Sequence, residues 1–173
     1  VGFSSINAMV FEQLRDWVIT VVMDELEKAE EDTAEALNLM NLAGCLYVGQ
    51  GKYELAKLFF TDCLEKRTTV LGPDHLLTLK SMFNLATLFW RRGKYEEAES
   101  FHLKCLEKRK VILSMEHLET LDSMNDLALV YKKQKKYKEA EELLQESLKI
   151  RRSLFDSDQD TFINMNNLSL LYC

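Results

Sequence analysis

Apolar residues along the chain recur at two spacings. Over short stretches they return every three or four residues, which is the spacing of one face of an α-helix. One such series is Leu79, Met82, Leu85, Ala86 and Phe89. Over longer stretches the same residue types return after about 42 residues, which indicates an internal repeat. The period links Met40, Met82 and Met124; Tyr47, Phe89 and Tyr131; Ala56, Ala98 and Ala140; Arg67, Arg109 and Arg151.

Each repeat divides into two helices at a short turn. In the second repeat the turn falls at Gly93, and a second helical series begins at Tyr95. Glycine suits the left-handed residue that ends a helix. Lys135 stands at the same place in the third repeat, so we expect that turn to be less stable. Residues 71–76 connect one pair to the next, and we expect Asp74 to cap the following helix.

A single helix pair buries too little apolar surface to offset the entropy lost on ordering its backbone. Neighbouring pairs must therefore stack, which predicts an all-α solenoid of antiparallel helix pairs. The period defines a repeat array over residues 33–173, with repeats at about 34–75, 76–117 and 118–158 and a partial repeat at 159–173.

Residues 1–32 fit the period less well than the rest of the chain. The period aligns Val18 and Val21 with Phe60 and Cys63, and it places Leu14 where later repeats have alanine. We interpret this segment either as an N-terminal capping helix or as a degenerate half-repeat.

The repeats resemble the tetratricopeptide repeat (TPR), and their period is similar to that of the kinesin-light-chain type. Leu85-Ala86, Phe89, Ala98 and Cys105 have the spacing of the TPR signature, and Gly93-Lys94-Tyr95-Glu96-Glu97-Ala98 matches the longer consensus. The resemblance implies an all-α, right-handed superhelical solenoid (an α–α superhelix). The chain departs from the pattern at Leu42 and Asp126, where the family usually has Asn, and at His102, where it usually has an aromatic residue.

In this family the first helices of successive pairs line a concave groove that binds a protein or an extended peptide. The resemblance places the following residues in that groove: Asn41, Cys45, Phe83, Thr87, Trp90, Arg91, Asn125, Leu129, Lys132, Lys133 and Asn166. We expect Phe83 and Trp90 to anchor the peptide, because they lie two turns apart on one helix face. The basic residues favour acidic side chains in the partner. The alternative is that Phe83 and Trp90 pack against the adjoining repeat.

Composition and charge narrow the function further. The 173 residues carry a formal charge of −6, and this acidic balance argues against nucleic-acid binding. No apolar run reaches the roughly 18 residues that a membrane span needs. We find no catalytic, metal-binding or phosphate-binding motif, so we expect a scaffold that has no enzymatic activity and needs no cofactor or metal.

The histidines and cysteines have structural interpretations. His75 and His117 occupy equivalent connectors, which favours a role in the repeat over catalysis, and we expect His102 to be packed with its nitrogens satisfied. Cys63 and Cys105 share one small buried site. Reduced thiols favour a cytoplasmic location.

Two other functions remain open. The array could be a structural element that self-associates through an apolar C-terminal end formed by Leu168, Leu171 and Tyr172. It could also be a regulatory sensor array in a larger protein, because a chain that begins at Val1 and ends at Cys173 looks like a fragment.

Overall fold

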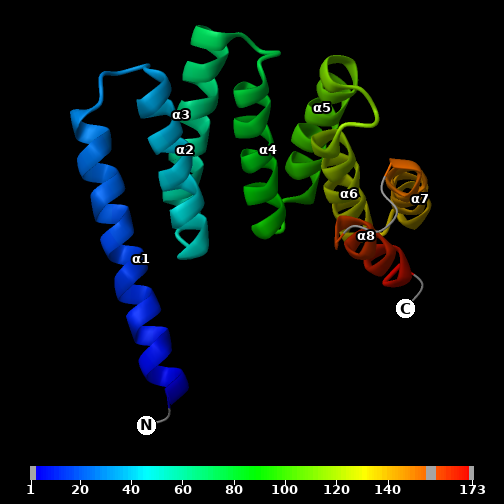
Figure 1. Ribbon diagram of the computed structural model, residues 1–173, viewed down its shortest axis with the longest axis horizontal. Helices are drawn as coiled ribbons and strands as arrows, with labels where there is room; N and C mark the ends of the chain where they lie inside the picture. Colours follow the sequence, from blue (N-terminus) through cyan, green and yellow to red (C-terminus); the bar gives the residue numbers. More distant parts are fainter. Residues whose placement is uncertain (1–2, 155–158, 172–173) are drawn as a thin grey trace. The chain divides into compact units, whose positions relative to one another are not determined.

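Helices account for all the regular structure that the computed structural model describes, which covers residues 3–154 and 159–171 (Figure 1). In chain order they are α1 (Phe3–Lys28), α2 (Ala34–Gly49), α3 (Tyr53–Leu71), α4 (Leu76–Arg91), α5 (Tyr95–Leu113), α6 (Leu118–Lys133), α7 (Tyr137–Leu154) and α8 (Gln159–Ser169). They divide into two compact units: unit 1 is Val1–Ser81 and unit 2 is Met82–Cys173, with the division inside α4. No described helix is both long enough and apolar enough to cross a membrane.

In unit 1, α1 packs on α2 and α2 packs on α3 (Figure 1). The core between them contains Leu37, Met40 and Cys63, with Leu26 of α1 against its edge. The face that α1 buries differs from the predicted one: Ile19 and Val22 are buried, whereas Val21 is 39% exposed. The predicted alignment of Val18 and Val21 with Phe60 and Cys63 is therefore wrong by one residue, about 100° of rotation around the helix.

In unit 2, α5 packs on α6, α6 on α7 and α7 on α8. Leu106, Leu121, Met124 and Leu127 form one core cluster. Ala128, Ala140 and Leu144 form another, and Leu168 and Leu171 of the last repeat pack against it. Leu168 and Leu171 of the predicted apolar end are therefore partly covered, and Tyr172 lies outside the described residues. The exposed apolar side chains of this segment are Phe162, Ile163 and Leu170.

Three turns inside the helix pairs share one left-handed residue. Gly51 and Gly93 have φ of 72° and 73°, and Lys135 has φ of 64° at the equivalent position. Lys135 adopts a backbone conformation that a side chain disfavours, as the sequence predicts.

Two of the helices that follow a connector, α4 and α6, are capped by histidine. The His75 Nδ1 accepts a hydrogen bond from the Leu77 N–H, and the His117 Nδ1 accepts one from the Glu119 N–H, both at 3.2 Å. The predicted cap at Asp74 is therefore wrong, because the chain enters α4 one residue later. These bonds give His75 and His117 the structural role that their repeat positions predict.

A buried arginine cross-links the helices of each repeat. The Arg67 guanidinium on α3 donates to the carbonyl oxygens of Leu37 and Leu77 and to the side chains of Asn38 and Ser81, at 2.7–3.3 Å. It thereby joins α2 to the first turns of α4. A buried charge is stable only when it is paired or hydrogen-bonded in this way.

The two later arginines repeat this arrangement with different partners. Arg109 on α5 pairs with Glu119 at 2.9 Å and donates to Ser123 Oγ at 2.7 Å. Arg151 on α7 pairs with Asp122 of α6 at 2.6 Å.

One close contact varies in size from repeat to repeat. Gly44 faces Phe60, and a Cβ built on Gly44 would lie 2.4 Å from the Phe60 ring. One period later the equivalent residues are Ala86 and His102, and two periods later they are Ala128 and Leu144. Gly44, the smallest of the three first-helix residues, thus faces Phe60, the largest of the three second-helix residues.

Candidate functional site

A pocket of about 180 Å³ lies in unit 2 between α4, α5 and α6. The residues that line it are Thr87, Trp90 and Arg91 of α4, His102 of α5, and Asp126 and Leu129 of α6. Four of these residues, the three of α4 and Leu129, belong to the groove predicted from the sequence. The volume is below that of ordinary small-molecule sites and suits a single side chain.

A second pocket of about 300 Å³ adjoins the first, since Asp126 lines both. Its other lining residues are Phe83, Asp122, Asn125, Arg151, Ile163 and Asn164. Phe83 and Asn125 belong to the predicted groove. First helices therefore supply most of the lining of both pockets.

Asp126 is the most perturbed carboxyl group in this region. Burial, followed by the charge of the neighbouring Asp122 carboxylate, raises its pKa from 3.8 to about 6, although the positive charge of Arg109 opposes both effects. Asp122 and Arg109 each form an ion pair with another residue. Asp126 forms none in the part of the chain that the structure describes.

His102 forms one wall of the first pocket and is only 1% exposed. Its ring meets the edge of the Phe83 ring, with centroids 5.3 Å apart. Burial, followed by the positive charge of Arg109, lowers the pKa of His102 from 6.5 to about 4, so the imidazole is neutral at neutral pH. Its Nδ1 has no hydrogen-bond partner among the described residues, which contradicts the expectation of a fully satisfied imidazole.

The two predicted anchors are partly buried. The Arg109 guanidinium lies 5.0 Å from the centre of the Phe83 ring, so Phe83 packs inside the unit and also lines a pocket. The Trp90 indole Nε1 is buried and has no acceptor among the described residues. A buried indole N–H usually has a partner, so that of Trp90 is an unsatisfied donor.

The other predicted groove residues of unit 2 differ in whether their side chains already form hydrogen bonds. Lys132 Nζ donates to the Leu170 carbonyl oxygen at 2.6 Å, and Asn125 Oδ1 accepts from Asn167 at 2.9 Å. Lys133 and Asn166 are exposed on α6 and α8. In unit 1, Asn41 is half-buried and Cys45 is exposed, both on α2.

His102 and Asp126 are the pocket residues that the groove prediction missed. The sequence marks both as departures from the family pattern, and it predicts a packing role for His102. At these two positions the chain therefore differs in chemistry from the repeats that it resembles.

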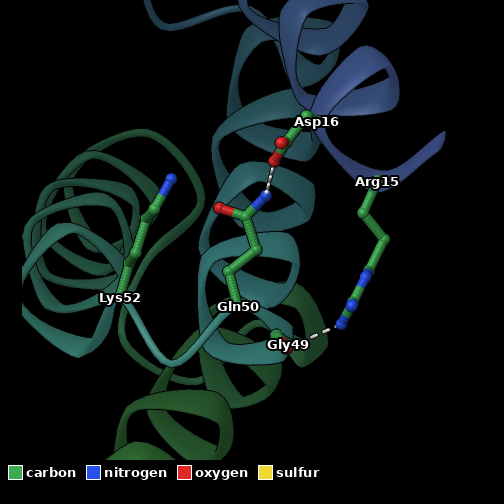
Figure 2. Close-up of a pocket in the computed structure, with 5 residues that line it drawn as sticks. All are labelled: Arg15, Asp16, Gly49, Gln50 and Lys52. Atoms are coloured by element: carbon green, nitrogen blue, oxygen red, sulfur yellow. Dashed lines mark hydrogen bonds between the residues drawn. The ribbon is translucent and has the colours of Figure 1, made fainter. Parts of the chain in front are cut away.

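A larger pocket of about 410 Å³ lies in unit 1, where α1 meets the turn between α2 and α3 (Figure 2). Arg15 Nη1 donates to the Gly49 carbonyl oxygen at 3.2 Å, and Gln50 Nε2 donates to Asp16 Oδ1 at 2.5 Å. Figure 2 shows both bonds bridging α1 to this turn, while Lys52 lies to one side. The bonds attach α1 to the first repeat.

Comparisons with known proteins identify the class of protein and then its family. The fold is that of a helical-repeat protein, and family models for the tetratricopeptide repeat match residues 32–110 and 120–159. Together these matches span more than half of the chain, which therefore belongs to the tetratricopeptide repeat family. No curated protein sequence matches it.

Solved structures show the same fold. BtubC (BKLC) from P. vanneervenii matches with a TM-score of 0.83 and 20% identity, over 93% of this chain and 66% of that one. The nearly identical TPR-like repeats of a kinesin-light-chain-like protein from Podosopora anserina match with a TM-score of 0.76 and 20% identity, over 93% and 77% of the two chains. The Sgt2 TPR domain from Aspergillus fumigatus matches with a TM-score of 0.57 and 16% identity, over 81% and 78%.

These matches confirm the predicted all-α, TPR-like superhelical fold and the kinesin-light-chain-like repeat type. The chain spans about two thirds of the length of BtubC. A TPR array is a protein–protein interaction scaffold of a non-catalytic type.

Proposed function

We propose that unit 2 binds an extended segment of a partner protein across α4 and α6. The observation that supports this proposal is the convergence of Thr87, Trp90, Arg91 and Leu129 on one pocket and of Phe83 and Asn125 on the pocket beside it. Two adjoining pockets that share one wall suit successive side chains of an extended chain.

Phe83 and Trp90 supply the apolar contact in this proposal. Aromatic residues that line pockets contribute most of the binding energy at many protein interfaces. Arg91 and Lys133 are exposed and favour acidic residues in the parts of the partner segment that lie outside the pockets. Lys132 contributes less, because its ammonium group already binds the Leu170 carbonyl oxygen.

A peptide array probed with the purified chain tests the proposal. Peptides that bind are then measured by fluorescence anisotropy against Phe83→Ala and Trp90→Ala, with helicity checked by circular dichroism. We expect at least a tenfold loss of affinity while the fold stays intact. Trp17→Ala is the matched control, because Trp17 is 64% exposed on α1, in the other unit, and its loss leaves the affinity unchanged. Unfolding of both unit 2 variants would instead support the packing role.

Two finer points belong to the same proposal. The exposed Phe162, Ile163 and Leu170 support self-association through the last described helix, and light scattering of a Phe162→Ser variant against the wild type tests it. The buried Cys63 and Cys105, which form no disulfide, support a cytoplasmic location, and fractionation of cells expressing the tagged chain would check it.

A further inference from the structure

We propose that the pocket between α4, α5 and α6 is a subsite for one basic side chain, lysine or arginine, of the bound segment, with the Asp126 carboxylate as its counter-ion. This inference rests on the proposed binding of a protein segment to unit 2. It reverses the charge preference inside the pocket relative to its surroundings, where Arg91 and Lys133 favour acidic residues.

The positively charged groups near Asp126 do not form an ion pair with its carboxylate in the described part of the chain. The positively charged groups that line its two pockets or act on its pKa are Arg91 at the exposed end of α4, Arg151 on α7 and Arg109 on α5. Arg109 is paired with Glu119, and Arg151 with Asp122. Arg91 lines the pocket but forms no ion pair with Asp126 in the described part of the chain. A half-buried carboxylate without a partner gains most from a ligand that brings a positive charge.

The other walls of the pocket accept a cation. The imidazole of His102 is neutral, so it adds no positive charge, and its Nδ1 can accept a hydrogen bond in the tautomer that is protonated on Nε2. The indole ring of Trp90 attracts a cation held over its face. Its Nε1–H can donate to a backbone carbonyl of the same segment, and Leu129 can pack against the aliphatic part of a lysine or arginine. One basic residue in an extended chain therefore satisfies each polar group that the pocket leaves open.

The pKa of Asp126 adds a pH dependence to this binding. With a pKa of about 6, the carboxyl group is ionised at pH 7.5 and largely protonated at pH 5. A cation should then bind about tenfold more weakly at pH 5, where about a tenth of the carboxyl groups remain ionised. The charge of a lysine side chain does not change over this range, so the effect belongs to the protein.

The first test uses n-butylammonium as a lysine side-chain probe and needs no peptide. Its binding is followed by NMR through the indole N–H signal of Trp90, assigned with a Trp17→Phe variant. We expect a saturable shift at pH 7.5 that weakens about tenfold at pH 5 and is lost in Asp126→Asn. The indole signal of Trp17 is the internal control, because Trp17 is exposed on α1 in the other unit. This signal should stay constant. Asp126→Asn keeps the size of the side chain and supplies the residue that the family usually has there.

Matched probes give the outcomes that would overturn the subsite. An equal response to 1-butanol or to butyrate, or an unchanged response in Asp126→Asn, shows that the pocket does not select a cation. The pH titration of the wild type tests the subsite even if the variant fails to fold. A butylammonium response that is the same at pH 5 and pH 7.5 refutes the role of Asp126.

A second test separates this inference from the proposed function. A displayed peptide library is selected on the wild type and on Asp126→Asn. We expect one position enriched in lysine or arginine on the wild type alone. Enriched peptides without such a position refute the subsite and leave segment binding intact. A library with no enriched peptide, together with a specific butylammonium response, refutes segment binding and supports the cation site.

Discussion

Replacing Asp126 by asparagine should stabilise unit 2, by an amount that depends on pH. The folded state raises the pKa of this carboxyl group from 3.8 to about 6, which means that folding disfavours its charged form. Between these two values the folded protein binds more protons than the unfolded chain, so the wild type loses stability as the pH rises. Above pH 6 this destabilisation is fully present, and at strongly acidic pH it disappears.

The magnitude follows from the two pKa values. One unit of pKa corresponds to about 1.4 kcal/mol, so the full effect of Asp126 is about 3 kcal/mol. About 1 kcal/mol of this effect already applies at pH 4.5, because part of the unfolded chain is ionised there. The stability advantage of Asp126→Asn should therefore grow by about 2 kcal/mol between pH 4.5 and pH 7.5.

The assay is urea unfolding followed by the fluorescence of Trp90 in a Trp17→Phe background, so that the signal reports on unit 2 alone. Other titrating groups, including His102 with its lowered pKa, contribute alike to both proteins and cancel in the difference. Asp122→Asn, one turn earlier on α6, is the matched control and should be destabilising at pH 7.5, because it removes the carboxylate that pairs with buried Arg151.

A difference between Asp126→Asn and the wild type that stays constant with pH would refute the reasoning, as would a variant that is less stable at pH 7.5. Either result would mean that the folded protein solvates the Asp126 carboxylate as well as water does.

Three further predictions concern stability, and circular dichroism during urea unfolding checks each. Lys135→Gly should stabilise the chain by about 0.5–1 kcal/mol, because φ is 64° there, and Gly93→Ala should destabilise it by a similar amount. Gly44→Ala should cost about 1–3 kcal/mol through its contact with Phe60, and adding Phe60→Leu should recover most of that loss; a double variant no better than the single one would contradict this. Arg67→Met should cost about 3 kcal/mol by removing four hydrogen bonds, two of them buried, and Arg67→Lys should cost less; equal losses would exclude a role for the charge.

The repeat positions made the fold predictable from the sequence. Each of the residues Met40, Ala56 and Arg67 recurs about 42 residues later, and similar neighbours at each step favour similar packing. The period also led to the left-handed turn at Lys135, since its place in the repeat could be compared with Gly93.

Prediction failed where the role of a residue depends on local geometry that the repeat pattern does not determine. The cap at the start of α4 is His75, and composition alone favoured Asp74 one residue earlier. The rotation of α1 depends on how one nonrepeating helix seats against α2, which no comparison within the chain could reveal.

The candidate site was predictable in part for the same reason. Positions such as Thr87, Trp90 and Leu129 follow from the family pattern, and the structure places them on one pocket. The charge state of that pocket depends on the burial of Asp126 and His102 and on the ion pairs that occupy the nearby arginines. Those properties arise only from the three-dimensional arrangement of α4 to α6.

The buried arginines also bear on how such a protein can change length during evolution. Arg67 binds its own helix pair and the first turns of the next pair, and Arg109 likewise pairs with Glu119 of the pair that follows. A duplicated repeat can therefore satisfy its arginine only where the helix after it begins with suitable acceptors. Ser81 and Ser123, one period apart, show that successive first helices keep such an acceptor.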